Sequence, residues 1–287
     1  MRDLSGRTAL VTGASTGIGR AVAQALAREG MNLVLAARSA DTLRDVAREL
    51  STTSVRAIDV PTDVSDPRAV EKLVERSADE FGAIDVLVNN AGIEAFREYH
   101  ELEISAITQT IDVNLTAGLV LARLVLPHML REGRGHIVNM SSTAGKHGPA
   151  YGAAYGASKA GLIAFTESVR GEYRGSGISA SVICPGFTHD GGIFDRIREE
   201  TGRGTPYLMG STSADAVARA VIRAIRHDLP EVIVNRPPLR PLFVLAEMFP
   251  SLAEWCIQKT TTRFFKRVAL SKRRQSETAR NVRQKAA

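Results

Sequence analysis

The sequence predicts an α/β fold, a doubly wound parallel sheet, followed by a helical and basic C-terminal extension. Short, continuously apolar stretches alternate with amphipathic stretches of helical periodicity, which is the pattern of a parallel sheet covered on both faces. A glycine-rich turn joins the first apolar stretch to the first helical one. Since no internal repeat or low-complexity linker interrupts this alternation, we predict one domain over residues 1–235 and an extension over 236–287.

The elements of the domain follow from the apolar runs and their spacing. Residues 7–13 predict a buried strand, and the helical spacing of Ile18, Val22 and Leu26 predicts a helix that Gly30 ends. Further strands are predicted at residues 33–36, 55–60, 84–88, 136–140, 179–183 and 231–234. Further helices are predicted at residues 43–50, around 70–74, at 104–130 with a break near Asp112, at 152–173 and at 213–227.

The composition restricts the class of protein. With 287 residues, 44% of them hydrophobic and 24% charged, the chain is neither wholly disordered nor collagen-like. The sequence has no run of 18 uncharged apolar residues, so we predict no transmembrane helix. Residues 1–10 lack the apolar core of a secretory signal. Two cysteines make no disulfide framework and no four-ligand zinc set, so we expect no metal and a reducing, cytoplasmic location.

The net charge of +6 is unevenly spread along the chain. Residues 259–287 contain ten of the 37 basic residues and only one of the 31 acidic ones, Glu277. The rest of the chain therefore has more acids than bases. Any attraction to an anionic partner is expected from the C-terminal extension and not from the domain.

The turn at residues 12–19 has the composition of a phosphate-binding loop. Gly13 allows a tight turn, Gly17 lets the backbone approach a pyrophosphate, and Gly19 lets helix and strand pack closely, while the helix N-terminus faces the phosphates. The spacing is G-x-x-x-G-x-G and differs from the commonest dinucleotide fingerprint, G-x-G-x-x-G. The alternative is an ordinary glycine-rich turn.

The end of the second predicted strand bears on the choice of coenzyme. NAD-binding folds usually carry an acid there for the ribose 2′-hydroxyl, whereas this chain has Ala36-Ala37-Arg38. A guanidinium pairs with a 2′-phosphate that an acid would repel, so Arg38 favours NADP over NAD. The alternative is that Arg38 is a solvated surface charge.

Together these features resemble the classical short-chain dehydrogenase/reductase family. The loop at 12–19 is similar to its coenzyme motif, Asn89-Asn90-Ala91-Gly92 to the element after its fourth strand, and Pro185-Gly186 to the turn after its sixth. Asn114, Ser142, Tyr155 and Lys159 occur in the order and at the spacings of its catalytic tetrad. The resemblance spans residues 7 to about 235 and implies a Rossmann-type fold. The predicted coenzyme contacts are Gly13, Ser15, Thr16, Gly17, Ile18, Gly19, Arg38, Asp63, Val64, Asn90, Ala91, Gly92, Tyr155, Lys159, Pro185, Gly186 and Thr188.

Tyr155 and Lys159 lie at i and i+4 on a predicted helix and therefore share a face. An ammonium at ~4 Å favours a phenolate by about 4 kcal/mol at an effective dielectric of ~20. That lowers a phenol pKa by roughly three before burial raises it again. The resemblance implies that Tyr155 is the acid/base and that Lys159 lowers its pKa and holds the nicotinamide ribose. It also implies that Ser142 polarises the substrate oxygen and that Asn114 fixes a water in a proton relay.

Several alternatives accompany these assignments. Ser141 is an alternative to Ser142, although the serine thirteen positions before Tyr155 is Ser142. Tyr151 has no lysine four residues further on, which favours a pocket or packing role for it. Asn114 is alternatively a helix-capping or kinking residue. Asp63 resembles a residue near the adenine in the family but is alternatively the cap of the helix entered at Pro67.

The segment after Pro185-Gly186 departs from the family pattern. The family often has a threonine four residues beyond the glycine, at a contact with the nicotinamide carboxamide, whereas this chain has Asp190 there and Thr188 earlier. In the family, residues 187–209 correspond to the substrate lid. Apolar residues in this segment predict a lipophilic substrate, and the alternative is that they pack on the domain: Phe187, Ile193, Phe194, Tyr207 and Leu208.

The extension begins with a break at Arg236-Pro237-Pro238. Apolar residues at helical spacing (Leu242, Leu245, Ala246, Phe249) predict one helix, Pro250 interrupts it, and a capping box from Ser251 to Glu254 predicts a second helix with Trp255 and Cys256. Phe264 and Phe265 then stand among bases. We slightly favour a helix that packs on the domain or on a partner subunit over an interfacial membrane anchor.

The sequence therefore predicts an NADP(H)-dependent oxidoreductase that interconverts a carbonyl and a secondary alcohol on a lipophilic molecule. A 3-oxoacyl thioester reductase is an alternative within enzymes. A coenzyme-binding scaffold or sensor at a membrane is an alternative of a different class, against which the intact catalytic set argues. We expect a homodimer or homotetramer, with a possible contact between the extension and anionic membrane. We expect no nucleic-acid partner, because the basic run has no recognition motif.

Overall fold

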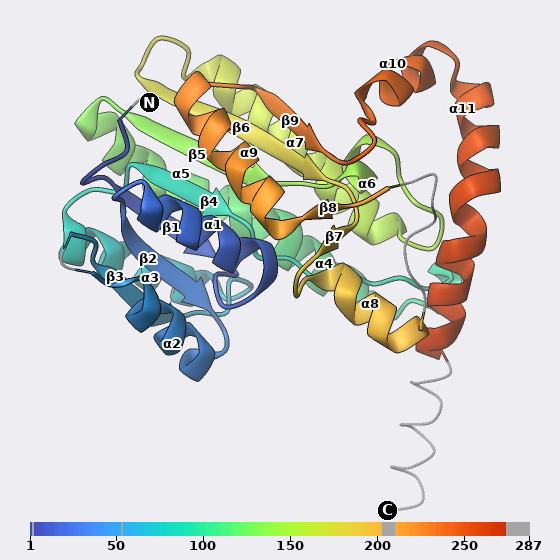
Figure 1. Cartoon of the computed structure of the whole chain (residues 1–287), viewed down its shortest axis with the longest axis horizontal. Coiled ribbons are helices and arrows are strands. Elements are labelled where there is room, and N and C mark those ends of the chain that lie inside the picture. Colours follow the sequence, from blue (N-terminus) through green and yellow to red (C-terminus); the bar gives the residue numbers. More distant parts are fainter. Residues whose placement is uncertain (2, 53, 203–209, 274–287) are drawn as a thin grey trace, which may run out of the picture.

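Seven parallel strands form the central sheet in the computed structural model, which describes residues 1, 3–52, 54–202 and 210–273 (Figure 1). The strand order is β3-β2-β1-β4-β5-β6-β9, the Rossmann-type order that the sequence predicts. The strands are β1 (Thr8–Thr12), β2 (Asn32–Ala37), β3 (Ala57–Pro61), β4 (Val86–Asn89), β5 (Gly135–Met140), β6 (Ile178–Pro185) and β9 (Glu231–Val234).

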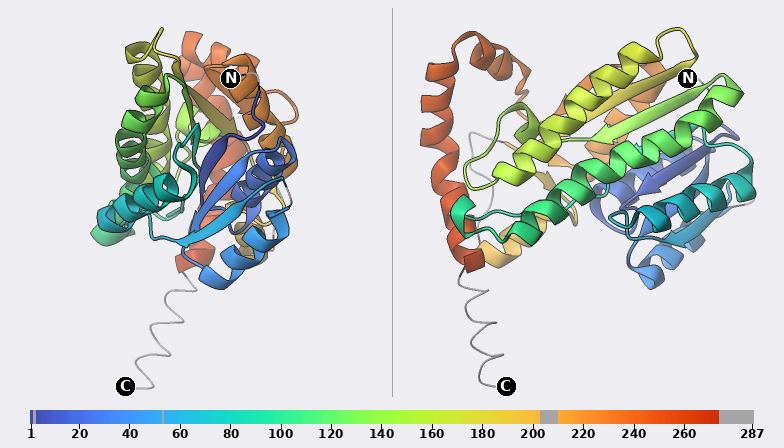
Figure 2. Two further views of the ribbon diagram at one scale, coloured as in Figure 1. Left: turned by 90° about the vertical axis from the view of Figure 1, so that its left-hand side faces the viewer. Right: turned by 180° about the vertical axis from the view of Figure 1, so that it is seen from behind.

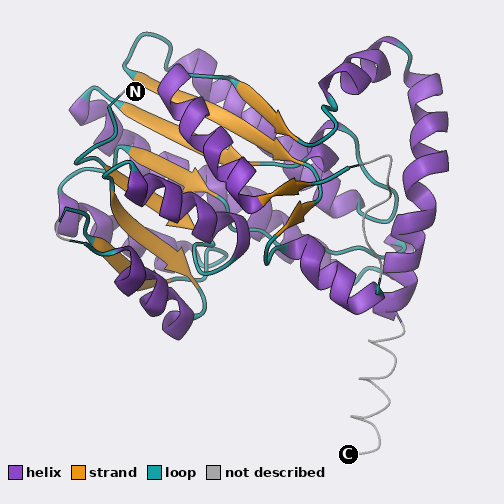
Figure 3. Ribbon diagram, viewed as in Figure 1, coloured by secondary structure: helices purple, strands orange, loops and turns teal. Residues whose placement is uncertain are grey.

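Helices cover both faces of this sheet, as Figures 2 and 3 show. Neighbouring residues of β1 pack into hydrophobic cores on opposite faces of the sheet: Val11 belongs to the cluster on one face and Leu10 to the cluster on the other. The first face is packed by α1 (Gly17–Arg28), α2 (Ala40–Leu50) and α9 (Ala214–His227). The second is packed by α3 (Pro67–Phe81), α5 (Ala117–Glu132) and α7 (Ala153–Glu172). Burial on both faces explains why the strands are continuously apolar.

The chain crosses over β1 when it passes from β3 to β4, so the strand order reverses between β1 and β4. In open α/β sheets ligands bind in the crevice outside the carboxyl ends of the strands at such a reversal. The glycine turn after β1 and the Asn-Asn-Ala-Gly element after β4 both lie at this edge. The topology thus places the two predicted coenzyme motifs side by side.

The long helix predicted at residues 104–130 is continuous. Its first part, α4 (Ile104–Ile111), joins α5 through a π-helical turn, η2 (Asp112–Thr116), so the regular α-helix is interrupted at Asp112 as expected, while the chain stays helical. The helix is long and apolar enough to cross a membrane by length and composition alone. Its apolar residues Leu121, Val125 and Met129, however, lie fully inside the core against the sheet.

The sequence pattern did not predict several short elements around the crevice. They are η1 (Tyr99–Glu101), α6 (Thr143–Lys146), β7 (Thr188–His189), α8 (Ile193–Thr201) and β8 (Thr212–Ser213). The strand predicted at 55–60 instead spans Ala57–Pro61. Elements of two to four residues carry too few residues to show a period, and α8 lies in the segment that the sequence suggested as a lid.

The extension forms a helical arm, residues 240–273, beside the carboxyl edge of the sheet (Figure 1). It comprises α10 (Arg240–Met248), α11 (Pro250–Ile257), the π-helical turn η4 (Gln258–Thr262) and a continuing helix to residue 273. The lower half of the arm runs past α8. Ser251 is the second residue of α11, so the predicted capping box does not open it; Pro250 starts the helix, as proline favours the first helical position. Arg274, Arg280, Arg283 and Lys285 lie outside the described residues.

Candidate active site

A cavity of about 720 Å³ lies at the carboxyl edge of the sheet, between the glycine turn and the arm. It is lined by Ser142 and by every residue predicted to contact the coenzyme: Gly13, Ser15, Thr16, Gly17, Ile18, Gly19, Arg38, Asp63, Val64, Asn90, Ala91, Gly92, Tyr155, Lys159, Pro185, Gly186 and Thr188. Asn114 is buried behind the cavity wall and does not line it. The fold thus gathers residues from the carboxyl ends of six strands and from helix α7 into one space.

The glycine turn has the shape that a phosphate cradle needs. Gly13 and Gly17 have φ of +65° and +54°, in the left-handed region that favours glycine. A Cβ on Gly19 would collide with the carbonyl oxygen of Gly13, so only glycine allows this approach. The side chain of Thr16 caps no amide of α1, which leaves the first-turn N–H groups for an anion. These features fit a dinucleotide pyrophosphate.

Arg38 and Asp63 lie together where β2 and β3 end. Arg38 is exposed on the cavity rim, and its charge contributes to lowering the pKa of Asp63, after the larger effect of hydrogen bonds from the Ser65 hydroxyl and amide. Asp66 is the residue whose carboxylate caps α3, by accepting from the amide of Arg68. The alternative that Asp63 caps this helix is therefore wrong.

Tyr155 and Lys159 project from one face of α7 into the cavity. Ser142 lies near enough to Tyr155 to lower the pKa of the phenol, which brings the predicted acid/base and the predicted polarising residue together. Ser142 Oγ also accepts from the amide of Ala144 at 3.1 Å and thereby caps α6. Ser141 is buried and donates to the backbone oxygen of Lys159 at 2.7 Å. Geometry thus favours Ser142 over Ser141.

The pKa values of Tyr155 and Lys159 differ from what the sequence predicts. Burial raises the pKa of Tyr155, and the nearby Ser142 offsets only part of that rise. Burial lowers the pKa of Lys159 to about 8. Lys159 Nζ donates to the backbone oxygen of Met140 at 2.8 Å and lies 5.8 Å from the centre of the Tyr155 ring. The expected lowering of the Tyr155 pKa is therefore wrong for this state, in which the phenol holds its proton at neutral pH.

Asn114 occupies the π-helical turn η2 and supports the cavity wall from behind. Its side chain accepts from the amide of Ile93 at 2.8 Å and donates to the oxygen of Ile93 at 2.9 Å. It also lies 3.1 Å from Ser158 Oγ. A single π-helical turn within an α-helix often marks a functional site. The water relay remains a prediction, because these contacts show only how Asn114 fixes the segment after β4.

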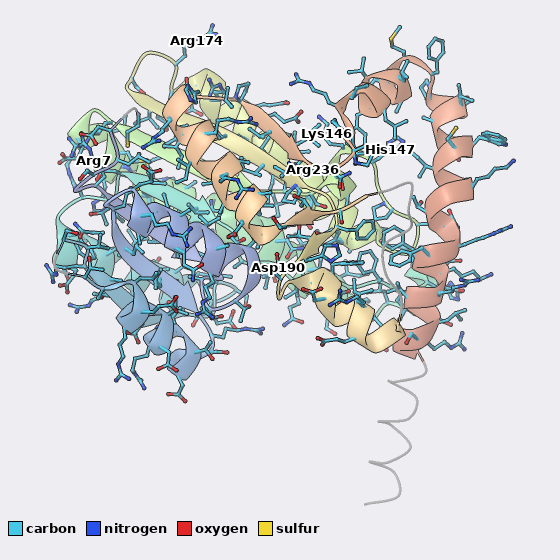
Figure 4. All side chains as sticks on the ribbon, viewed as in Figure 1. Arg7, Lys146, His147, Arg174, Asp190 and Arg236 are labelled. Atoms are coloured by element: carbon cyan, nitrogen blue, oxygen red, sulfur yellow. The ribbon has the colours of Figure 1, made fainter. Side chains whose placement is uncertain are left out.

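The segment after β6 places Thr188 and Asp190 differently. Thr188 is 6% exposed, lines the cavity and donates to the oxygen of Gly186 at 3.1 Å. Asp190 is exposed, has a φ of +82° and does not line the cavity (labelled in Figure 4). Thr188 is therefore the residue of this pair that is placed to meet a ligand.

An aromatic cluster forms the wall opposite the glycine turn. Phe187 contacts Phe194, Phe264 and Phe265, with ring centres 4.9, 5.6 and 6.2 Å apart. Phe96 lies 5.8 Å from Tyr155 and 5.1 Å from Phe265. Phe187, Ile193 and Phe194 line the cavity as the lid prediction requires, whereas Tyr207 and Leu208 lie outside the described residues.

The arm supplies much of the same wall, which the sequence did not predict. Its cavity-lining residues are Leu242, Phe243, Ala246, Ala253, Cys256, Ile257, Thr261 and Phe265. The sequence signs were the apolar helical spacing from Leu242 to Phe249 and the pair of phenylalanines among bases, which favoured packing on the domain without indicating the cavity. A local pattern shows that such residues are apolar but not which distant surface they cover.

Comparisons with known proteins agree with this architecture. A family model described as short chain dehydrogenase matches residues 7–201. The ketoacyl reductase HetN of Nostoc sp. is 40% identical over 239 residues, which cover 83% of this chain and 82% of that protein. A 3-oxoacyl-[acyl-carrier-protein] reductase of Synechocystis sp. is 38% identical over 188 residues, covering 65% and 76%.

Solved structures give the same result. A short-chain dehydrogenase/reductase of Burkholderia phymatum in complex with NAD has a TM-score of 0.78 at 29% identity, covering 88% of this chain and 96% of that one. A metagenomic short-chain oxidoreductase in complex with NADP has a TM-score of 0.69 at 35% identity, covering 81% and 98%. The chain belongs to the short-chain dehydrogenase/reductase family, whose members are oxidoreductases that use a nicotinamide coenzyme to act on small-molecule carbonyl or alcohol groups.

Proposed function

We propose that this protein is an NADP(H)-dependent oxidoreductase that interconverts a carbonyl and a secondary alcohol on a lipophilic substrate. The observation that carries the proposal is that Ser142 and Tyr155 line one cavity near each other, with Lys159 one helical turn from Tyr155. The pair lies in a cavity with a glycine cradle at one end and an aromatic wall at the other. This arrangement provides a proton donor between a coenzyme site and an apolar site.

Arg38 supports the choice of NADP. It is an exposed cation on the cavity rim at the end of β2, and Ala37 beside it offers no carboxylate to repel a 2′-phosphate. Bidentate contacts between guanidinium and phosphate are among the stronger charge-assisted hydrogen bonds. The solved relatives include one complex with NAD and one with NADP, so this support comes from Arg38 itself.

The residues of the site have complementary tasks during reduction. The bound coenzyme supplies a hydride to the carbonyl carbon. The Tyr155 hydroxyl donates its proton to the carbonyl oxygen, and the Ser142 hydroxyl donates a hydrogen bond to the same oxygen. A phenol with a raised pKa holds this proton at neutral pH until the oxygen becomes negative. Lys159 then favours the remaining phenolate and is placed to hold the nicotinamide ribose.

The apolar wall supports a lipophilic substrate. Phe96, Phe187, Phe194 and Phe265 face the cavity around Tyr155, and such a wall gains free energy when it excludes water against an apolar ligand. A 3-oxoacyl thioester is the second candidate. It is favoured by the names of two relatives, a ketoacyl reductase and a 3-oxoacyl-[acyl-carrier-protein] reductase.

We also propose a cytoplasmic location and a homodimer or homotetramer. The reducing location is supported by the two free cysteines, Cys184 and Cys256, which form no disulfide. A catalytically silent scaffold at a membrane is the less favoured candidate, because such a role does not require Ser142, Tyr155 and Lys159 to meet in one cavity.

The test is NADPH oxidation with a panel of hydrophobic ketones, aldehydes and 3-oxoacyl thioesters. We expect turnover with wild-type protein and a loss of at least 10²-fold in the Tyr155→Phe variant, which lacks only the proton donor. The variant should still bind NADPH, which fluorescence titration checks. Absence of turnover across the panel, or a Tyr155→Phe variant as active as wild type, would refute the proposal.

A further inference from the structure

The arm exposes a row of large apolar side chains to solvent. Leu245, Met248, Phe249, Leu252 and Trp255 are 53%, 65%, 53%, 59% and 56% exposed. They lie on α10, on α11 and, for Phe249, at the junction between them, on the side away from the cavity, and no described residue covers them. We call these five residues the outer face. Figure 4 shows side chains standing out from this side of the arm.

The opposite side of the same two helices is also apolar. Phe243, Ala246, Ala253 and Ile257 line the cavity. Apart from the exposed Glu247 and Glu254, these helices therefore carry apolar side chains on two sides, which is typical of helices with apolar surroundings on both sides, as in a protein core or at a lipid surface. In this arm the inner side meets the substrate cavity, so the outer face requires a second apolar environment.

The charges next to the outer face indicate which environment this is. Lys259 Nζ lies 3.9 Å from the centre of the Trp255 ring, so a cation and an amphipathic aromatic residue occur together at the end of α11. Arg263, Lys266 and Arg267 follow along the arm and are exposed. Tryptophan beside lysine and arginine is typical of helices that lie in the interface of an anionic bilayer.

The distribution of charge over the whole chain favours the same partner. Residues 259–287 hold ten basic residues and one acidic residue, whereas the remainder of the chain has more acids than bases; of the ten bases, Lys272 and Arg273 pair with Glu94 and Glu101 of the domain. An anionic surface therefore attracts the arm and not the domain, which orients the molecule. Two arms paired face to face would instead bring these bases together, which opposes a symmetric dimer through the outer face.

We infer that the outer face binds the surface of an anionic lipid bilayer, with the bases meeting the headgroups and the apolar side chains entering the acyl boundary. The inner side of the arm then forms a wall shared by the bilayer surface and the cavity. A lipophilic substrate dissolved in the membrane reaches the cavity along this wall. This last step rests on the proposed function, whereas the binding of lipid does not.

Trp255 is the only tryptophan of the chain and reports directly on this surface. The full-length protein is mixed with vesicles of phosphatidylcholine containing phosphatidylglycerol, and with vesicles of phosphatidylcholine alone. We expect co-sedimentation and a shift of Trp255 emission to shorter wavelength with the anionic vesicles. Both effects should weaken as salt rises, because the electrostatic part is screened.

Two variants test the two parts of the surface. Leu245→Ser with Leu252→Ser removes apolar side chains that do not line the cavity, and we expect at least tenfold weaker binding. Lys259→Glu with Lys266→Glu reverses two exposed charges. At low salt we expect this variant to bind anionic vesicles about tenfold or more weakly than wild type, and we expect this difference to disappear at high salt. Leu130→Ser is the matched control, since Leu130 is 46% exposed at the other end of the sheet.

The outcomes separate the possibilities. Thermal melting and NADPH binding of each variant check that it is folded. An absence of wild-type binding to anionic vesicles at low salt overturns the inference, as does equal binding by the control and the outer-face variants. If outer-face variants dissociate an oligomer while vesicles bind none of the proteins, a second copy is the partner and the lipid inference is wrong. Vesicle binding without any ketone turnover would leave the lipid inference standing and refute only the proposed reaction.

Discussion

Lys272, at the end of the described arm, forms an ion pair with Glu94 in the segment after β4. The two side chains are only 18% and 13% exposed. Glu94 lies near enough to Tyr155 for its carboxylate to raise the pKa of the phenol. The arm therefore neutralises an anion beside the proposed proton donor, although it lies more than 100 residues away in the chain.

Removing this ammonium should change both stability and pH dependence. In Lys272→Gln we expect the free energy of unfolding to fall by about 1–3 kcal/mol, because Glu94 loses its partner in a mostly buried position. We also expect the pKa of Tyr155 to rise further. The rate of alcohol oxidation, which needs the phenolate, should then increase only at higher pH than in wild type. Lys266→Gln, an exposed base on the same helix, is the control. A pH profile unchanged by Lys272→Gln would show that Glu94 has no effect on Tyr155.

Coenzyme preference should depend on the end of β2. In Ala37→Asp with Arg38→Gln, a carboxylate replaces a guanidinium where we place the 2′-phosphate, and we expect the NADPH/NADH preference in kcat/KM to fall by about 10–100-fold. Arg44→Gln, which removes an exposed arginine of α2, serves as control. Equal use of NADH and NADPH by the wild-type protein would contradict the assignment of Arg38.

The buried Lys159 should reduce stability at neutral pH. Its pKa falls from 10.5 to about 8 in the fold, so the unfolded chain binds more protons than the native protein between these values, and stability rises with pH across that window. Below pH 8 the native protein carries a buried ammonium at a cost of roughly 3 kcal/mol. We expect Lys159→Met to be inactive yet more stable than wild type at pH 7, with a smaller difference at pH 9. Melting at both values measures this, and a difference that does not change with pH would contradict it.

Truncation after Asn235 should leave the sheet intact and impair substrate use. It removes Phe264 and Phe265, which are 8% and 5% exposed and cover Phe187 and Phe96. We expect poorer solubility and a raised KM for hydrophobic ketones, with NADPH binding largely retained. The point variant Phe265→Ala should raise the same KM without the solubility defect. A truncated protein with unchanged solubility, assembly and kinetics would show that the arm is dispensable.

Much of the fold and of the candidate site was predictable because the determining interactions are local. A strand buried on both faces must be apolar throughout, and Leu10 and Val11 show this on neighbouring positions of β1. The tight turn at Gly13 and the approach at Gly19 require glycine in a short span of chain. The i, i+4 spacing of Tyr155 and Lys159 shares one face of α7, and parallel strands bring their carboxyl ends to one edge.

The sequence by itself thus determined the sheet, its main helices and the phosphate cradle, and it supplied the residues that we propose as the catalytic set. Only the tertiary structure decided that Lys159 bonds the Met140 carbonyl and has a pKa near 8, that the helix at Asp112 continues through a π-helical turn, and that Phe265 packs in one aromatic cluster with Phe96 and Tyr155. Proton affinity depends on burial and on partners distant in the chain, and apolar periodicity shows that a face will be covered but not by what. Those properties arise from packing between segments, which no local pattern contains.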